Sequence, residues 1–155
     1  MNSGNKTINF RINKAGLTII ELLVVIGIFA IFLSGGLFLN IDSFKSYYFY
    51  AEEKMINSLL RVARNRAVSN INHVSHGLFI SDNDLVLFRG ENYDENSPFN
   101  EDFRRNESVQ VENGFANQSV IFENLSGKPR QIGEIRIFDN QRETTISINS
   151  EGRID

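Results

Sequence analysis

The 155-residue chain contains no cysteine. This absence excludes a disulfide framework and any metal site built from thiolates. Small exported domains often rely on disulfide bonds, so packing alone must stabilise the domain that this chain forms. Proline is also absent between residues 17 and 70, which leaves that stretch free to form continuous helix. The length suffices for one modest domain plus an appendage.

Acidic residues are absent from the first 16 residues, which contain Lys6, Arg11 and Lys14 and therefore carry +3. Because the whole chain carries -3, subtracting this +3 leaves -6 for residues 17–155. An acidic body disfavours broad electrostatic affinity for nucleic acid, although a local basic patch is still compatible with it.

Charge is also missing from the twenty residues 22–41, between Glu21 and Asp42. At about 1.5 Å rise per residue, a helix of this length spans the roughly 30 Å hydrocarbon core of a bilayer. The run is too long and too uniformly apolar for one face of a helix in a small domain. Basic residues before it and acids soon after it predict a transmembrane segment with a cytoplasmic N-terminus and an extracytoplasmic C-terminal domain.

From Phe44 to about Ser69 the pattern becomes amphipathic, with apolar residues at three- and four-residue steps. This predicts the second half of the same long helix, packed on a soluble domain. The predicted buried stripe comprises Tyr48, Met55, Leu59, Val62 and Ala63. The predicted solvent-facing charges are Glu52, Glu53, Lys54, Arg61 and Arg64.

After Asn70 the sequence changes to short β-prone segments with polar breaks. Strands are predicted at 73–80, 84–90, 108–112, 119–123, 134–138 and 144–149, with the first two and the last two forming hairpins. The polar residues 91–107 predict a long solvated loop rather than a calcium site, because they lack EF-hand spacing. The pieces predict an α+β fold with a long N-terminal helix packed on an antiparallel β-sheet.

Glu21 is the unusual residue of the N-terminal region. An ordinary secretory signal has a shorter apolar core and a small-x-small cleavage site after it, and an ordinary signal anchor does not explain the glutamate. A carboxylate in a membrane helix costs a few kcal/mol and usually has a partner, yet the apolar run holds no basic residue. Cleavage before Leu17 would create an α-amino cation, and a neighbouring subunit's Glu21 would pair with it. The alternative is an interfacial carboxylate that reaches the headgroups.

The stretch LTIIELLVVIGIFAIF, which begins at Leu17, resembles a type IV prepilin signal: a basic leader ending in glycine, then an apolar helix with glutamate as its fifth residue. The resemblance implies cleavage by prepilin peptidase between Gly16 and Leu17, N-methylation of Leu17, and charge pairing by Glu21 during assembly. Leu17 stands where the family most often has phenylalanine. The implied partners are other pilins or pseudopilins, an inner-membrane assembly platform and membrane lipid.

This resemblance gives the predicted domain organisation. Residues 1–16 are the prepilin leader, residues 17–42 the transmembrane and assembly half of the helix, and residues 43–155 a soluble pilin-like domain. Within that domain the helix covers 43–70 and the sheet 73–155. The implied location is a single-pass cytoplasmic (inner) membrane protein, which after assembly lies in a pilus or pseudopilus.

Two further stretches are similar to GspH/FimT-like pseudopilins, which are minor pilins. Residues 55–79 contain an Ala-Arg-x-x-Ala-like stretch at 63–67 before a strand, and residues 146–155 resemble a terminal strand that closes on Gly152-Arg153. The similarity implies a structural subunit of a type IV pilus-like or type II secretion filament. The alternative is a membrane-anchored filament-tip module for DNA uptake or substrate capture.

Arg153 is the candidate DNA contact, because some FimT-like members end in a Gly-Arg-x-Arg motif associated with DNA binding. Asp155 replaces the last arginine here, so the motif is incomplete. Arg61, Arg64 and Arg66 would extend a basic patch, but such a run more commonly forms a solvated helix face.

No catalytic residue, cofactor or metal site is predicted, and we expect a protein that is not an enzyme. His73 and His76 are the only histidines, and on a strand their three-residue spacing would point them to opposite faces. The chain has no Gly-x-Ser-x-Gly motif, no phosphate loop and no zinc-binding helix motif.

Overall fold

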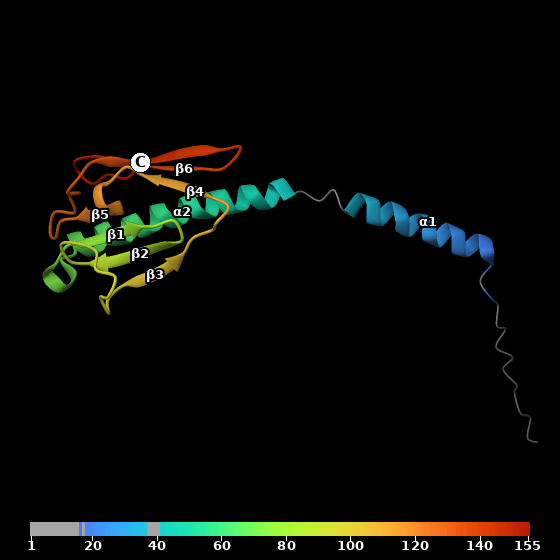
Figure 1. Cartoon of the computed structure of the whole chain (residues 1–155), viewed down its shortest axis with the longest axis horizontal. Coiled ribbons are helices and arrows are strands. Elements are labelled where there is room, and N and C mark those ends of the chain that lie inside the picture. The colour runs from blue at the N-terminus through green and yellow to red at the C-terminus, as the bar shows by residue number, and fades with distance from the viewer. Residues whose placement is uncertain (1–15, 17, 37–40) are drawn as a thin grey trace, which may run out of the picture. The chain divides into compact units, whose positions relative to one another are not determined.

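The computed structural model describes residues 16, 18–36 and 41–155 (Figure 1). The chain divides into one unit that ends at Asn40 and a second from Ile41 to Asp155, and each is described by itself. The first unit contains α1 (Ile19–Gly36). The second begins with α2 (Ile41–Val68), so the predicted amphipathic helix is confirmed. Whether α1 and α2 form one continuous helix depends on residues 37–40, which lie outside the described residues.

Seven strands and two 3-10 turns follow α2 in the second unit. The turns are η1 (Ile71–His73) and η2 (Ala116–Gln118). The strands are β1 (His76–Ile80), β2 (Asp84–Arg89), β3 (Glu101–Arg104), β4 (Gln110–Asn113), β5 (Ser119–Phe122), β6 (Gly133–Phe138) and β7 (Glu143–Ile148).

The strands form two antiparallel sheets rather than the single predicted one. One sheet has the order β3-β2-β1-β5 and the other the order β4-β6-β7. The predicted hairpins β1–β2 and β6–β7 are confirmed, with Leu78 opposite Leu87 and Ile135 opposite Ile146. The division arises because β5 pairs with β1 whereas β4 pairs with β6. The α+β class, with a helix packed on antiparallel strands, is as predicted.

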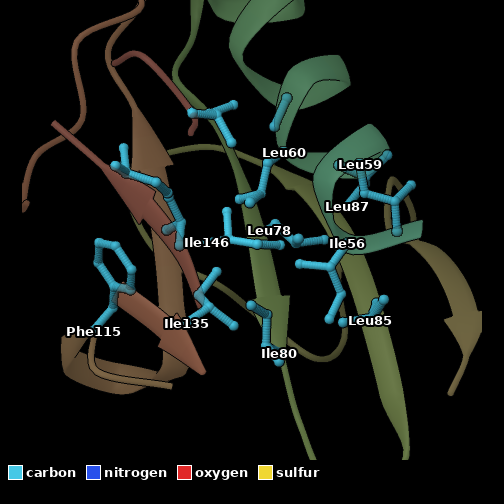
Figure 2. Close-up of a cluster of buried hydrophobic side chains, with 14 of the residues drawn as sticks. Ile56, Leu59, Leu60, Leu78, Ile80, Leu85, Leu87, Phe115, Ile135 and Ile146 are labelled. Carbon is cyan, nitrogen blue, oxygen red and sulfur yellow. The ribbon is translucent and has the colours of Figure 1, made fainter. Parts of the chain in front are cut away.

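One hydrophobic core joins α2 to both sheets (Figure 2). Ile56 and Leu60 of α2 lie among Leu78 of β1 and Ile135 and Ile146 of the second sheet. The buried positions of α2 follow helical spacing, as an amphipathic helix requires. They are Phe49, Ile56, Leu59, Leu60, Ala63 and Ala67.

The predicted buried stripe of this helix is only partly right. Leu59 and Ala63 are buried, but Met55 and Val62 are half-buried and Tyr48 is exposed. In place of Tyr48 and Met55, the residue that follows each in the chain is buried, namely Phe49 and Ile56. Adjacent apolar residues point about 100° apart on a helix, so the packing partner decides which of the two is buried.

Glu52, predicted to face solvent, is instead buried against Arg105 between β3 and β4. Arg105 Nε lies 2.7 Å from Glu52 Oε1, and each side chain is 2% exposed. The same guanidinium donates to the carbonyls of Ser81, Asp82 and Val109 at 2.6–3.0 Å. The network satisfies both charges and fixes α2 to two connections of the sheets.

The predicted solvated loop over 91–107 is also corrected, since it contains β3 and a structured aromatic contact. Tyr93 stacks on Phe79 of β1 with ring centroids 4.0 Å apart and contacts the edge of Phe88 of β2. This segment therefore covers part of the first sheet. Tyr93 gives this otherwise polar segment an apolar surface to bury. The prediction missed it because the overall composition of the segment is polar.

Candidate functional site

The start of α1 places Glu21 in the first turn of the helix. The Glu21 amide donates to Thr18 Oγ1 at 3.3 Å, and the Leu22 amide donates to the Thr18 carbonyl at 3.1 Å. Thr18 is thus the N-cap, and Thr-x-x-Glu is the spacing of a capping box. A carboxylate here also lies at the positive end of the helix dipole. Glu21 is exposed, and its carboxylate has no hydrogen-bond or ion-pair partner among the described residues.

The predicted cleavage junction is described only on one side. Gly16 is exposed, whereas Leu17 and the leader residues 1–15 lie outside the described residues. A Cβ atom built on Gly16 meets no atom within 4 Å. Among the described residues, nothing restricts the size of a side chain at position 16.

Over residues 19–32 of α1 the side chains are exposed and, apart from Glu21, apolar. A helix that is apolar on all sides is normally buried in protein or lipid, so this surface is suited to a partner. The exposed residues are Ile19, Ile20, Leu22, Leu23, Val24, Val25, Ile26, Ile28, Phe29, Ile31 and Phe32. Across the part of the chain that the structure describes, no helix reaches both the length and the apolar character needed to span a membrane.

The C-terminal segment brings the candidate DNA contact Arg153 next to two arginines of α2. Arg61, Arg64 and Arg153 line one cavity of about 440 Å³ together with Asp155. Arg61 donates to the Ile154 carbonyl at 3.3 Å. Arg153 Nε lies 2.6 Å from Asp155 Oδ1, so the acid that interrupts the expected motif partly neutralises it. Three arginines and one aspartate leave this cavity basic.

The backbone at Gly152 and the side chain of Arg64 shape that cavity. Gly152 has φ +74° and is buried, and a Cβ there would lie 2.2 Å from the Gly127 carbonyl oxygen. Only glycine fits this left-handed, crowded position. Arg64 donates to the Glu151 carbonyl at 3.3 Å, while its Nε is buried without a hydrogen-bond partner among the described residues.

Arg66 does not join this basic cluster. It forms a two-point pair with Glu101 of β3, at 2.6 and 3.0 Å. The hydrogen bond from Arg66 lowers the pKa of Glu101, and that carboxylate in turn raises the pKa of Arg66. The alternative of one basic patch formed by Arg61, Arg64 and Arg66 is therefore wrong, because Arg66 lies at a separate site. Of the expected solvated helix face, Arg61 is exposed, whereas Arg64 and Arg66 are half-buried.

The prediction that both histidines lie on one strand is wrong. His73 lies in η1 with φ +59°, where Asn70 and Asn72 also have left-handed backbone. His76 is buried at the start of β1, and a ring nitrogen lies 3.0 Å from the Ile71 carbonyl. Asparagines at positions 70 and 72 tolerate the left-handed backbone of this tight turn, and the strand begins three residues later than predicted.

Comparison with known proteins finds one match. The prokaryotic N-terminal methylation motif matches residues 11–37, which include Gly16, Leu17 and Glu21. No curated protein and no solved structure matches the chain. The match supports the type IV pilin-like prepilin signal inferred from the leader, and this motif implies processing by prepilin peptidase and assembly with other pilins. It does not extend to the regions of the GspH/FimT similarity.

The residues that sequence reasoning missed are those joined across long separations. Glu52 and Arg105 lie 53 positions apart, and neither has a neighbour in the sequence that indicates the pair. The helix cap at Thr18 was also missed, although it could have been predicted. The pattern Thr-x-x-Glu before an apolar run indicates the start of a helix.

Proposed function

We propose that this chain is a structural subunit of a pilin-like filament, cut by prepilin peptidase between Gly16 and Leu17 and polymerised through its N-terminal helix. The observation that carries the proposal is the methylation motif over residues 11–37, with Glu21 exposed in the first turn of α1 and without an ion-pair partner among the described residues. Within this class, the similarity at 63–67 and 152–153 favours a GspH/FimT-like minor pilin of a type IV pilus-like or type II secretion machine. Its subunits are anchored in the cytoplasmic membrane and contact an assembly platform there.

The position of Glu21 in the first turn of α1 explains why the carboxylate is tolerated in the single chain. The helix cap does not provide a cation to pair with this carboxylate. A first-turn carboxylate gains about 0.3–1 kcal/mol from the helix dipole. Transfer of the same carboxylate into an apolar assembly costs several kcal/mol unless a cation accompanies it. The new α-amino group of Leu17 in a neighbouring subunit supplies that cation. The pair therefore forms only when subunits stack, and it sets their axial register.

Gly16 supports the cleavage step for a different reason. No described residue lies close enough to Gly16 to require a glycine there. Recognition by the peptidase therefore accounts for the small residue at this position. The full chain incubated with a prepilin peptidase should lose residues 1–16, as measured by intact mass. Gly16→Ala should slow this loss without unfolding the chain. An unchanged mass, or cleavage at another bond, would contradict the proposal.

Assembly is tested with substitutions that separate charge from helix capping. Glu21→Gln keeps a residue that functions in a capping box but removes the charge. Thr18→Ala removes the cap and keeps the charge. We expect Glu21→Gln to be processed normally yet to form few filaments, as judged by electron microscopy of sheared cells. Thr18→Ala should assemble.

Glu53→Gln provides the matched control, because it removes a glutamate charge from α2, outside the apolar segment. It should assemble as the unmodified chain does. Normal filaments from Glu21→Gln would show that charge pairing is not what holds the subunits together.

The basic cavity supports a second candidate function, the capture of DNA at a filament tip. Arg61, Arg64 and Arg153 face one cavity although residues 17–155 carry a net -6. If this is a DNA site, a labelled oligonucleotide should bind residues 41–155 with an affinity that falls as salt rises. Arg153→Ala should weaken that binding, whereas Lys54→Ala on α2 should not. Absence of binding at low salt would remove this candidate.

A further inference from the structure

The N-terminal turns of α2 expose four aromatic side chains, which we call the aromatic belt. These turns extend past the ends of the strands of the same unit (Figure 1). The belt consists of Phe44, Tyr47, Tyr48 and Tyr50, with exposed fractions of 65%, 70%, 42% and 52%. Phe49, in the same stretch, is 2% exposed and belongs to the core. The belt is thus the part of this aromatic segment that the domain does not cover.

Two of the belt residues contact each other, and Tyr50 contacts the core residue Phe49 with ring centroids 5.6 Å apart. Tyr47 and Tyr48 lie edge to face with ring centroids 5.9 Å apart. Another side of the helix contacts the domain, because Arg142 of the β6–β7 hairpin donates to Ser46 Oγ. At 100° per residue, the four belt positions cover an arc of roughly 160°. All four belt side chains therefore lie on one side of these turns.

The position of the belt in the sequence indicates what covers it. The belt begins three residues after the uncharged run 22–41. From Phe44 to Tyr50 a helix rises roughly 9 Å. The headgroup layer on one side of a bilayer is about 5–8 Å thick. A chain anchored through that run would therefore hold the belt at the depth of the headgroups.

The chemistry of the belt fits the same layer. Three of its four residues are tyrosines, whose rings are apolar while their hydroxyls need a polar partner. Such residues concentrate at the boundary between hydrocarbon and water. Lys45, which is exposed beside the belt, would reach lipid phosphates.

We propose that the aromatic belt binds the phospholipid headgroup layer and sets the depth of the domain while the subunit waits in the membrane. This rests on the proposed membrane anchoring of the subunit. It goes beyond that function because it assigns a lipid-binding surface to the folded domain. On assembly, the belt would leave the lipid surface together with the subunit.

The absence of tryptophan makes the proposal directly measurable. Tyr47→Trp places a single fluorophore in the belt of the full chain, reconstituted in phosphatidylcholine and phosphatidylglycerol vesicles. Lipids brominated at different acyl depths then quench this fluorophore according to its depth. Ile132→Trp is the matched control, since Ile132 is as exposed as the belt but lies in the segment before β6. Val25→Trp reports whether α1 itself is inserted.

We expect Tyr47→Trp emission to shift to the blue and to be quenched most by bromines nearest the headgroups. Val25→Trp should be quenched most by deep bromines, and Ile132→Trp should not be quenched. Quenching of Val25→Trp but not of Tyr47→Trp would overturn the belt proposal alone. If neither is quenched, both the belt and the membrane anchoring fail. A blue shift of Tyr47→Trp that depends on protein concentration and not on lipid would make the belt a subunit interface instead.

Discussion

Replacing Glu52 with methionine tests whether the buried pair with Arg105 holds the domain together. Both side chains are 2% exposed, so the substitution leaves an arginine charge with no counter-ion in the core. Removal of one partner of such a pair costs about 3–5 kcal/mol. Domains of this size have a free energy of unfolding of about 5–15 kcal/mol. The single substitution should therefore remove a large part of the stability.

Arg105→Met should cost at least as much, because three backbone carbonyls lose their donor along with Glu52. The double variant should be more stable than Arg105→Met alone, because Arg105→Met leaves Glu52 as a buried carboxylate without a counter-ion and Glu52→Met removes that carboxylate. In that background Glu52→Met should therefore raise the free energy of unfolding, whereas in the unmodified chain it lowers it. The four proteins form a complete double-mutant cycle.

The assay is urea unfolding of residues 41–155, followed by far-ultraviolet circular dichroism. The matched control is Lys128→Met, which breaks the pair with Glu151, whose side chains are 53% and 70% exposed. An exposed pair of this kind contributes at most about 1 kcal/mol. If the Glu52 and Arg105 variants each lose less than that and their losses add, the buried network is not what fixes α2 to the sheets.

Three other substitutions test local features of the domain. Gly77→Ala should lower the melting temperature, because its Cβ would lie 2.5–2.7 Å from the ring of Phe88. Gly152→Ala should do the same and speed proteolysis of the C-terminal segment, because it combines φ +74° with a close backbone carbonyl. Glu101→Gln should cost under about 1 kcal/mol at neutral pH in urea unfolding, since the pair with Arg66 is partly exposed. Because the pKa of Glu101 is lowered, that cost should vanish as the pH falls through the lowered value.

The elements that local sequence determines were predictable. The β1–β2 and β6–β7 hairpins follow from alternating apolar residues around a short polar turn, as at 139–141. The methylation motif was equally visible, because glycine, the basic leader and Glu21 lie within one short stretch.

The features that depend on distant residues were not predictable. The division into two sheets depends on which strands pair with one another. Packing contacts among many distant residues determine that pairing. Glu52 was assigned to solvent because its charge gives no indication of a partner 53 positions away. Tyr48 was assigned to the core and Phe49 is buried instead, because an aromatic run carries apolar residues on every side of the helix.

The pairing of Glu21 with a neighbouring subunit's N-terminus is tested most directly in the filament itself. Filaments would be assembled from two populations of subunits, one with ¹⁵N in Leu17 and the other with ¹³C in the Glu21 carboxylate. Solid-state NMR should then detect dipolar coupling between subunits across a contact of about 4 Å. The absence of this coupling in well-formed filaments would contradict the account.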